Sequence, residues 1–219
     1  MRPGPARVKH RRLTTPAIRP HQASNGKARV TACFFGEGAM AEGEFHESMN
    51  LAALWDLPVL FCCENNLYAM GTALGRSEAA TDLALRASGY GMPAWPVDGM
   101  DVEAVSAATE RALTHVRSGA GPAFIEFRTY RFRAHSMYDP ELYRDKAEVA
   151  TWRTRDPITI LADRMSADGQ LDADAMAALE ADADVQIDRA VEFAEASPEE
   201  DVSTLDRYVY APATVEVGT

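Results

Sequence analysis

The sequence predicts an α/β fold, in which a parallel sheet has helices on both faces, followed by a helical C-terminal extension. The first observation behind this prediction is that short apolar runs alternate with helical periodicity between Arg29 and Tyr130. The second is that a strand, a helix and a strand follow one another early in this region, which is typical of a parallel crossover. The third is that helical patterns continue beyond residue 146 without further strands.

The early elements form a strand–helix–strand unit. Residues 30–35 are an apolar run that ends at Gly36, and this run predicts a buried strand. Residues 40–56 carry apolar side chains at helical spacing and predict a mostly buried helix. Pro58 interrupts the helical pattern, and residues 59–63 predict a second buried strand.

The later elements continue the alternation. They are predicted as a helix at 81–90, a strand at 94–97, a helix at 101–117, a strand at 123–130, a loop at 131–146, and helices at 147–153, 157–166 and 173–196. Asp101 is expected to cap the second of these helices, which should end at Ser118-Gly119.

These elements divide the chain into three segments. Residues 1–28 are a basic segment without periodicity, which we expect to be disordered and outside the domain. Residues 29–146 are the expected α/β domain, and residues 147–219 are the expected helical extension.

The charge distribution excludes some classes of function. Residues 1–29 contain eight Arg or Lys and no acid, so the rest of the chain is more acidic than its net charge of -11 indicates. An acidic body argues against nucleic-acid binding. No apolar run approaches the roughly 18 residues that a membrane span needs. Prolines disfavour a transit-peptide helix near the start, so we expect a bacterial cytoplasm, with the mitochondrial matrix as the alternative.

The three cysteines do not form a disulfide framework or a CxxC metal motif. Cys33, Cys62 and Cys63 all lie in apolar stretches. We therefore predict three buried thiols in a reducing compartment.

Two polar motifs follow the first two predicted strands. Gly36-Glu37-Gly38 ends the first strand, and Glu64-Asn65-Asn66 ends the second. Both turns should lie at the same edge of a parallel sheet, which is where ligands bind in open α/β folds. Carboxylate and amide oxygens suit Mg²⁺, which usually completes its coordination with phosphate and water. These motifs therefore indicate a diphosphate bridged by Mg²⁺.

The same residues permit two other interpretations. Residues 36–41 fit the pattern G-x-G-x-x-A, and Glu64 could bind a ribose, as in a dinucleotide-binding oxidoreductase. Glu37 argues against this, because it lies where the pyrophosphate would approach. The motif could also be an ordinary glycine turn with exposed acids. The residues alone leave all three interpretations open.

A family resemblance is carried by the stretch CFFGEGAMAEGEFHESMNLAALWDLPVLFCCENNLYAMGT. It resembles the thiamin diphosphate motif of the E1 alpha subunits of 2-oxo acid dehydrogenases, and the similarity extends over residues 28–212. ENNLYAMGT and TYRFRAHSMYDP look specifically like pyruvate dehydrogenase alpha subunits. The resemblance implies the thiamin diphosphate-binding fold with its N-terminal part missing from this chain. Branched-chain 2-oxo acid and acetoin dehydrogenase alpha subunits are the alternatives, and a non-catalytic fragment is a further one.

The resemblance also implies roles for individual residues. Glu37 takes the place of a metal-binding aspartate, Asn66 matches a side-chain metal ligand, and Tyr68 matches a residue whose main-chain carbonyl binds the metal. His135 matches a catalytic histidine near the cofactor. The remaining cofactor-binding positions that match are Gly36, Gly38 and Ala39. Arg131 and Arg133, in the same loop as His135, are expected to help hold anions.

The implied activity is the oxidative decarboxylation of pyruvate with thiamin diphosphate and Mg²⁺, followed by acyl transfer to the lipoyl group of E2. The implied partners are an E1 beta subunit, in an alpha2beta2 heterotetramer, and the E2 acyltransferase. Neither a nucleic acid nor a membrane is expected as a partner. We expect no decarboxylation by this chain without the beta subunit.

Overall fold

The computed structural model describes residues 29–207 and residue 209, so the expectations for residues 1–28 lie outside the described part. The chain divides into two compact units between Asp163 and Arg164. This division falls later than the boundary expected at residue 146. The reason is that α5 (Lys146–Arg153) packs onto the first unit, where Trp152 stacks on Tyr130. Helix α6 (Pro157–Ala167) extends across the division.

The first unit contains a four-stranded sheet in which every pair of neighbouring strands is parallel. In spatial order the strands are β1 (Thr31–Gly36), β2 (Val59–Asn65), β6 (Ala123–Arg128) and β5 (Ala94–Asp98). The parallel α/β prediction is confirmed. Gly36 pairs with Glu64, so β1 and β2 end at the same level.

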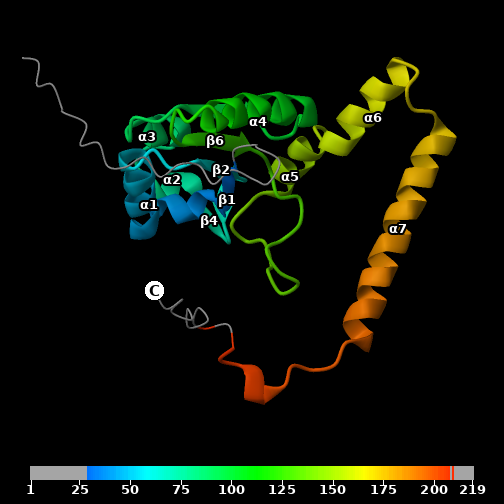
Figure 1. Ribbon diagram of the computed structural model, residues 1–219. Helices are drawn as coiled ribbons and strands as arrows, with labels where there is room; N and C mark the ends of the chain where they lie inside the picture. Colours follow the sequence, from blue (N-terminus) through cyan, green and yellow to red (C-terminus); the bar gives the residue numbers. More distant parts are fainter. Residues whose placement is uncertain (1–28, 208, 210–219) are drawn as a thin grey trace, which may run out of the picture. The chain divides into compact units, whose positions relative to one another are not determined.

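Helices cover both faces of this sheet. On one face, helices α1 (Gly43–Leu54) and α3 (Leu83–Ser88) pack against Phe61 and Phe124. On the other face, α4 (Val102–Arg117) packs against Cys62 and Ile125 and lies along β6 in Figure 1. The residues that pack on one face alternate along β2 and β6 with those that pack on the other, because successive side chains of a strand point to opposite faces.

Local sequence signals set the ends of α4. The Asp101 side chain accepts hydrogen bonds from the backbone N–H groups of Glu103 and Ala104. Gly119 follows the helix with a φ of 79°, a left-handed conformation that glycine adopts readily. The predicted cap and the predicted end of this helix are both confirmed.

Strand β1 differs from its prediction because it is an edge strand. Its residues are largely exposed, and Cys33 is among them. The exposed fraction of Phe34 is 65%. The predictions of a buried strand and of a buried Cys33 are therefore wrong. An apolar run predicts a strand, but its place in the sheet depends on which other strands pair with it. Cys62 and Cys63, on the interior strand β2, are buried as predicted.

Short elements near the ends of β1 and β2 were not predicted. A 3₁₀ helix, η1 (Glu37–Ala41), precedes α1. Beyond β2 come the short strands β3 (Tyr68–Ala69) and β4 (Thr72–Ala73), which pair antiparallel, and then α2 (Leu74–Ser77). This β3–β4 hairpin carries Tyr68, one of the residues expected at the metal site.

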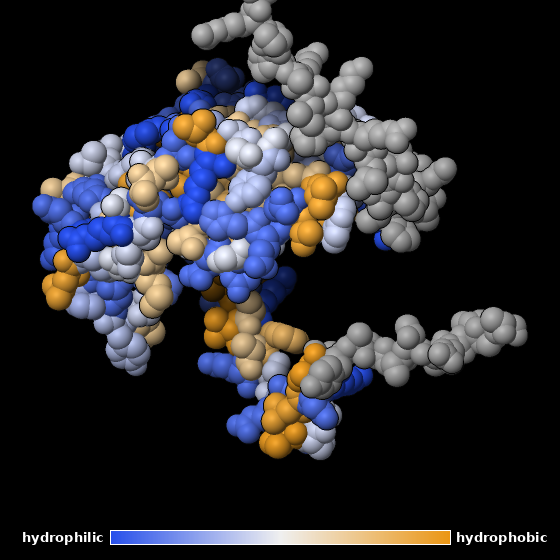
Figure 2. Space-filling view, turned by 90° about the vertical axis from the view of Figure 1, so that its left-hand side faces the viewer, coloured by the Kyte–Doolittle hydropathy of each residue, from blue (hydrophilic) through white to orange (hydrophobic). Residues whose placement is uncertain are grey.

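The second unit contains α7 (Ala173–Ala196) and η2 (Val202–Thr204), and no described residue in either is buried. The apolar side of α7, including Leu179 and Ile187, is exposed among the residues that the structure describes. No helix among residues 29–207 is long and apolar enough to cross a membrane. The surface seen in Figure 2 shows hydrophobic residues as separate patches among hydrophilic ones.

The different positions of the thiols predict different reactivities. A polar thiol reagent at neutral pH should modify Cys33 in the folded chain, because Cys33 is exposed. Cys62 should react far more slowly, because burial excludes the reagent and raises the pKa of the Cys62 thiol to about 11. Cys63 should resist for the same reason, since burial also raises its pKa. The number of thiols modified against time, before and after unfolding in denaturant, checks this. Rapid modification of a second thiol in the folded chain would contradict it.

Candidate functional site

The candidate site lies where β1 and β2 end. Glu37 directly follows β1, and Asn66 directly follows β2. Because the strands are parallel and end at one level, these residues are neighbours although 29 positions separate them in the sequence. The structure thus brings together the carboxylate and the asparagine that the sequence expected to converge.

Glu37 is buried, with an exposed fraction of 2%. Its Oε2 accepts a hydrogen bond from the backbone N–H of Asn66 at 3.2 Å. Its Oε1 is also buried and has no hydrogen-bond partner among the described residues. A buried carboxylate oxygen without a partner is costly unless a proton or a cation accompanies it. The geometry therefore leaves one oxygen of Glu37 available to a cation.

Two asparagines shape the turn after β2. The Asn65 side-chain oxygen accepts from the N–H of Leu67, and that of Asn66 accepts from the N–H of Tyr68, each at 3.1 Å. These are consecutive Asx turns. Leu67 lies between them at a φ of 75°, which is uncommon and strained for a residue with a side chain. The asparagines hold a backbone shape that would otherwise be unfavourable.

Asn65 is a structural residue that the sequence interpretation missed. Its amide donates to Oε1 of Glu126 at 2.8 Å, and Glu126 is fully buried on the neighbouring strand β6. Arg128 donates to the other oxygen of Glu126 at 3.1 Å. The available signal was an acidic residue within the apolar run AFIEFR. Such a residue indicates a buried hydrogen-bonded partner.

Gly38 is required by packing within the protein. A Cβ atom at this position would lie 2.5 Å from the Cβ of Ala69 in the β3–β4 hairpin. At Gly36, by contrast, a Cβ would meet no atom within 4 Å, and φ is -81°. The glycine at position 38 therefore lets η1 approach the hairpin that follows Asn66. Ala39, the other expected diphosphate position, is exposed.

Tyr68 joins the hairpin to α5. Its buried hydroxyl donates to the carboxylate of Glu148, 2.9 Å from Oε2 and 3.0 Å from Oε1. Burial and the hydrogen bond to this carboxylate raise the pKa of Tyr68. Burial and the same carboxylate raise the pKa of Tyr130 to about 12, and the Tyr130 hydroxyl donates to Oε1 of Glu148 at 3.0 Å.

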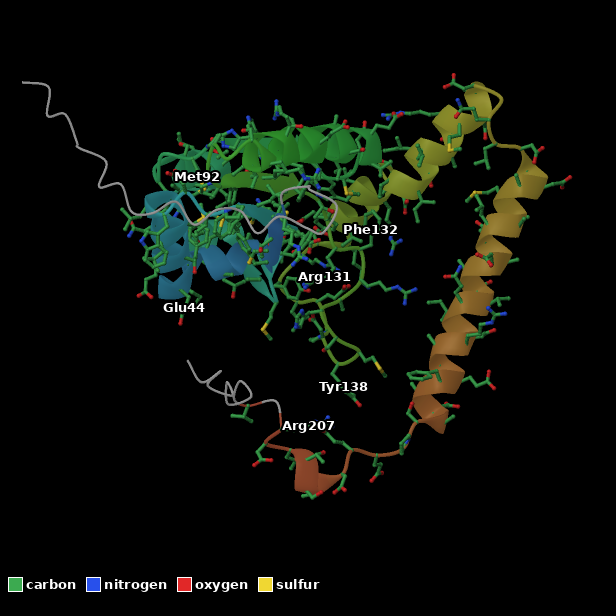
Figure 3. The ribbon with its side chains drawn as sticks, in the orientation of Figure 1. Glu44, Met92, Arg131, Phe132, Tyr138 and Arg207 are labelled. Atoms are coloured by element: carbon green, nitrogen blue, oxygen red, sulfur yellow. The ribbon has the colours of Figure 1, made fainter. Side chains whose placement is uncertain are left out.

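His135 is exposed in the loop that follows β6. Its Nδ1 lies 3.1 Å from a terminal guanidinium nitrogen of Arg131, which can only donate, so Nδ1 accepts. Its backbone N–H donates to Asp139 at 3.0 Å. Hydrogen bonds from the N–H groups of Glu141 and His135 hold the pKa of Asp139 below its usual value. Figure 3 shows Tyr138 at the outer end of this loop, where it is almost fully exposed.

Arg131 connects this loop to the hairpin. One terminal nitrogen donates to the Met70 carbonyl at 2.7 Å and to the Tyr143 hydroxyl at 3.1 Å, and the other contacts His135. Arg131 thus has a structural role inside the loop, and Arg133 is exposed. The expectation that these arginines hold anions remains a prediction.

Arg144 is a further structural residue, and the sequence around it carries no recognisable signal of this role. It is buried and donates to the carbonyls of Arg131 and Phe132, which lie at the start of the loop seen in Figure 3. It also forms an ion pair with Glu141. The loop is therefore held from within by two arginines.

The site residues form two groups. Glu37, Asn66 and Tyr68 are connected through the turn after β2, whereas His135 is linked to that turn through Arg131 and Met70. Within residues 29–207, no cluster of three or more His, Cys, Asp and Glu side chains could hold a metal ion. A metal held at Glu37 by three protein ligands would therefore include at least one ligand of another kind, such as an amide or carbonyl oxygen.

The fold and site define a class: parallel α/β proteins in which a buried carboxylate and an amide meet at the carboxyl edge of the sheet. The chain matches the family described as dehydrogenase E1 component over residues 11–203. This chain belongs to the dehydrogenase E1 component family. The match begins before residue 29, so the boundary expected at residue 28 remains a prediction.

Several curated relatives are similar to most of this chain. The pyruvate dehydrogenase E1 component subunit alpha of Porphyra purpurea is 41% identical over 186 residues, which cover 85% of this chain and 54% of the relative. The protein of the same name from Rhizobium meliloti (strain 1021) is 44% identical over 181 residues, which cover 82% of this chain and 52% of the relative. The somatic mitochondrial form of this subunit from Homo sapiens is 40% identical over 189 residues, which cover 85% of this chain and 48% of the relative. The chain therefore spans about half the length of the curated relatives it matches.

The close contact at Gly38 yields a stability prediction. Gly38→Ala should destabilise the folded chain by about 1–3 kcal/mol, because the new methyl group would overlap Ala69. Gly36→Ala is the matched control and should stay within about 0.5 kcal/mol of the unaltered chain, because its Cβ enters open space. Denaturant unfolding of both variants measures the difference. Equal stabilities would show that η1 and the hairpin do not pack as described.

Proposed function

We propose that this chain is the alpha subunit of a pyruvate dehydrogenase E1 component, which binds thiamin diphosphate with Mg²⁺. The reaction would be the oxidative decarboxylation of pyruvate, with transfer of the acyl unit to the lipoyl group of E2. The observation that carries the proposal is the buried, unpartnered Oε1 of Glu37 beside the Asn66 turn. Family membership and the names of the relatives support it.

The residues at the strand ends fit a magnesium–diphosphate group. Glu37 would supply a carboxylate oxygen, Asn66 its side-chain oxygen and Tyr68 its main-chain carbonyl, all of them ligands that suit Mg²⁺. The Asn66 oxygen accepts a single hydrogen bond from Tyr68, and an amide oxygen has a second lone pair. The backbone positions that would contact the diphosphate are Gly36, Gly38 and Ala39.

His135 would act on the substrate side of the cofactor. Because Arg131 donates to Nδ1, the neutral ring carries its hydrogen on Nε2. The ring can therefore donate a hydrogen bond from Nε2 to the substrate or transfer a proton there. When bound, thiamin diphosphate supplies the electron sink for decarboxylation, and the protein supplies binding, orientation and electrostatics.

The proposed partners are an E1 beta subunit, in an alpha2beta2 assembly, and the E2 acyltransferase. The names of the relatives, which describe a subunit of an E1 component, support them. The same names favour pyruvate over branched-chain 2-oxo acids or acetoin. Relatives from Rhizobium meliloti and from mitochondria agree with a bacterial cytoplasm or a mitochondrial matrix as the compartment.

Cofactor binding tests the proposed function directly. Thiamin diphosphate should bind the chain, reconstituted with an E1 beta subunit, only when a divalent metal is present. Asn66→Ala should weaken this binding at least about tenfold, because it removes a proposed ligand and one Asx turn. Asn50→Ala, at an exposed position of α1, is the control and should bind normally.

Titration calorimetry with and without chelator measures these affinities. Equal thiamin diphosphate affinity under both conditions would contradict the proposal. Metal-independent binding of NAD in the same assay would instead favour the dinucleotide-binding alternative.

Two substitutions at Glu37 separate charge from shape. Glu37→Asp should retain Mg²⁺ binding, because it keeps a carboxylate. Glu37→Gln should weaken Mg²⁺ binding at least about tenfold, because a neutral amide lacks the charge attraction. Mg²⁺ titration of both variants at fixed thiamin diphosphate makes the comparison. If both bind Mg²⁺ alike, Glu37 does not bind the metal.

A further inference from the structure

The carboxylate of Glu148 joins three segments that are distant in the sequence. It lies in the first turn of α5 and accepts hydrogen bonds from the hydroxyls of Tyr68 and Tyr130. Tyr68 belongs to the β3–β4 hairpin, two residues after Asn66, whereas Tyr130 follows the end of β6. Glu148 is thus a shared acceptor for the hairpin and for the segment that follows β6.

Both phenols are withdrawn from water at this contact. Tyr68 is 9% exposed and Tyr130 is 5% exposed, and both pack around the buried Met100. The two tyrosine rings meet edge to face at 6.4 Å, and Trp152 stacks on Tyr130 with ring centroids 5.1 Å apart. Hydrogen bonds to a carboxylate are stronger in such surroundings than in water. The contact therefore fixes the side chain of Tyr68 firmly.

The hairpin that Tyr68 belongs to needs such an anchor. Its strands have two residues each, and a hairpin of this size is not stable by itself. Leu67 and Met70, on either side of β3, both have positive φ angles, which cost energy unless surrounding contacts impose them. The main chain between Asn66 and Tyr68 lies within this strained segment.

We infer that Glu148 is a positioning residue for the proposed metal site. By holding the Tyr68 hydroxyl, it keeps the Tyr68 carbonyl and the Asn66 side chain in place to bind Mg²⁺. Glu148 itself does not touch the metal. This inference rests on the proposed function, because it assigns Glu148 a role toward the same magnesium–diphosphate group.

The test uses the full chain reconstituted with an E1 beta subunit, and its readout is the Mg²⁺ affinity at fixed thiamin diphosphate. Glu148→Ala should weaken Mg²⁺ binding by about 10- to 100-fold, the usual effect of removing a group that orients a metal ligand. Glu148→Gln retains one oxygen acceptor and should recover part of the affinity. Unfolding of each variant without metal measures the purely structural effect.

Two tyrosine variants provide a matched pair. Tyr68→Phe and Tyr130→Phe each remove one buried hydroxyl that donates to the same carboxylate. Tyr68→Phe should weaken Mg²⁺ binding nearly as much as Glu148→Ala, because it frees the hairpin. Tyr130→Phe should leave Mg²⁺ affinity within about threefold of the unaltered protein, because the link from Glu148 to Tyr68 remains.

The outcomes separate this inference from the proposed function. If the unaltered protein binds Mg²⁺ with thiamin diphosphate, and Glu148→Ala and Tyr68→Phe bind it equally well, Glu148 has only a structural role and the inference is overturned. Equal losses in Tyr68→Phe and Tyr130→Phe would also overturn it, since both would then act through general destabilisation. If the unaltered protein shows no metal-dependent binding, the proposed function and the inference fail together.

Discussion

The in-register parallel pairing of β1 and β2 is the constraint on which the candidate site depends. Gly36 lies opposite Glu64, so the chain leaves both strands at the same level. Glu37 and Asn66 then lie close enough for the Glu37 carboxylate to accept a hydrogen bond from the backbone N–H of Asn66. On the other side, the hydrogen bond from Asn65 to Glu126 fixes the end of β2 to β6. The position of the turn is therefore determined by the sheet.

The same geometry gathers carboxyl groups at this edge of the sheet. Glu37 and Glu126 are both buried close to β2. Burial, followed by the charges of Glu126 and Glu37, raises the pKa of the Cys63 thiol, because these carboxylates disfavour a further negative charge. An anionic diphosphate alone would meet the same repulsion. A divalent cation reverses it, which is why the metal and the diphosphate are physically inseparable in the proposed function.

The sequence predicts the features that depend on residues close together in the chain. It misses those that depend on residues that the fold brings together from distant parts of the chain. Asp101 and Gly119 bound α4 as predicted, because a cap and a left-handed glycine are local signals. The convergence of Glu37 with Asn66 was predictable from topology, since parallel strands end together. The exposure of Phe34 was not, because strand order is set by all strands at once. Glu148 also gave no signal, since an acid in the first turn of a helix is ordinary until its partners are known.

The β3–β4 hairpin determines how the two groups of site residues are coupled. Glu148 holds Tyr68 from α5, while Arg131 holds the Met70 carbonyl from the loop that carries His135. Both anchors act on one hairpin whose backbone is strained, so moving either one shifts the same few residues. Arg131 also holds His135, and the same guanidinium therefore orients the proposed catalytic ring and restrains the turn beside the proposed metal ligands. The histidine and the proposed metal-binding turn are thus parts of one hydrogen-bonded structure, although about 70 residues separate them in the sequence.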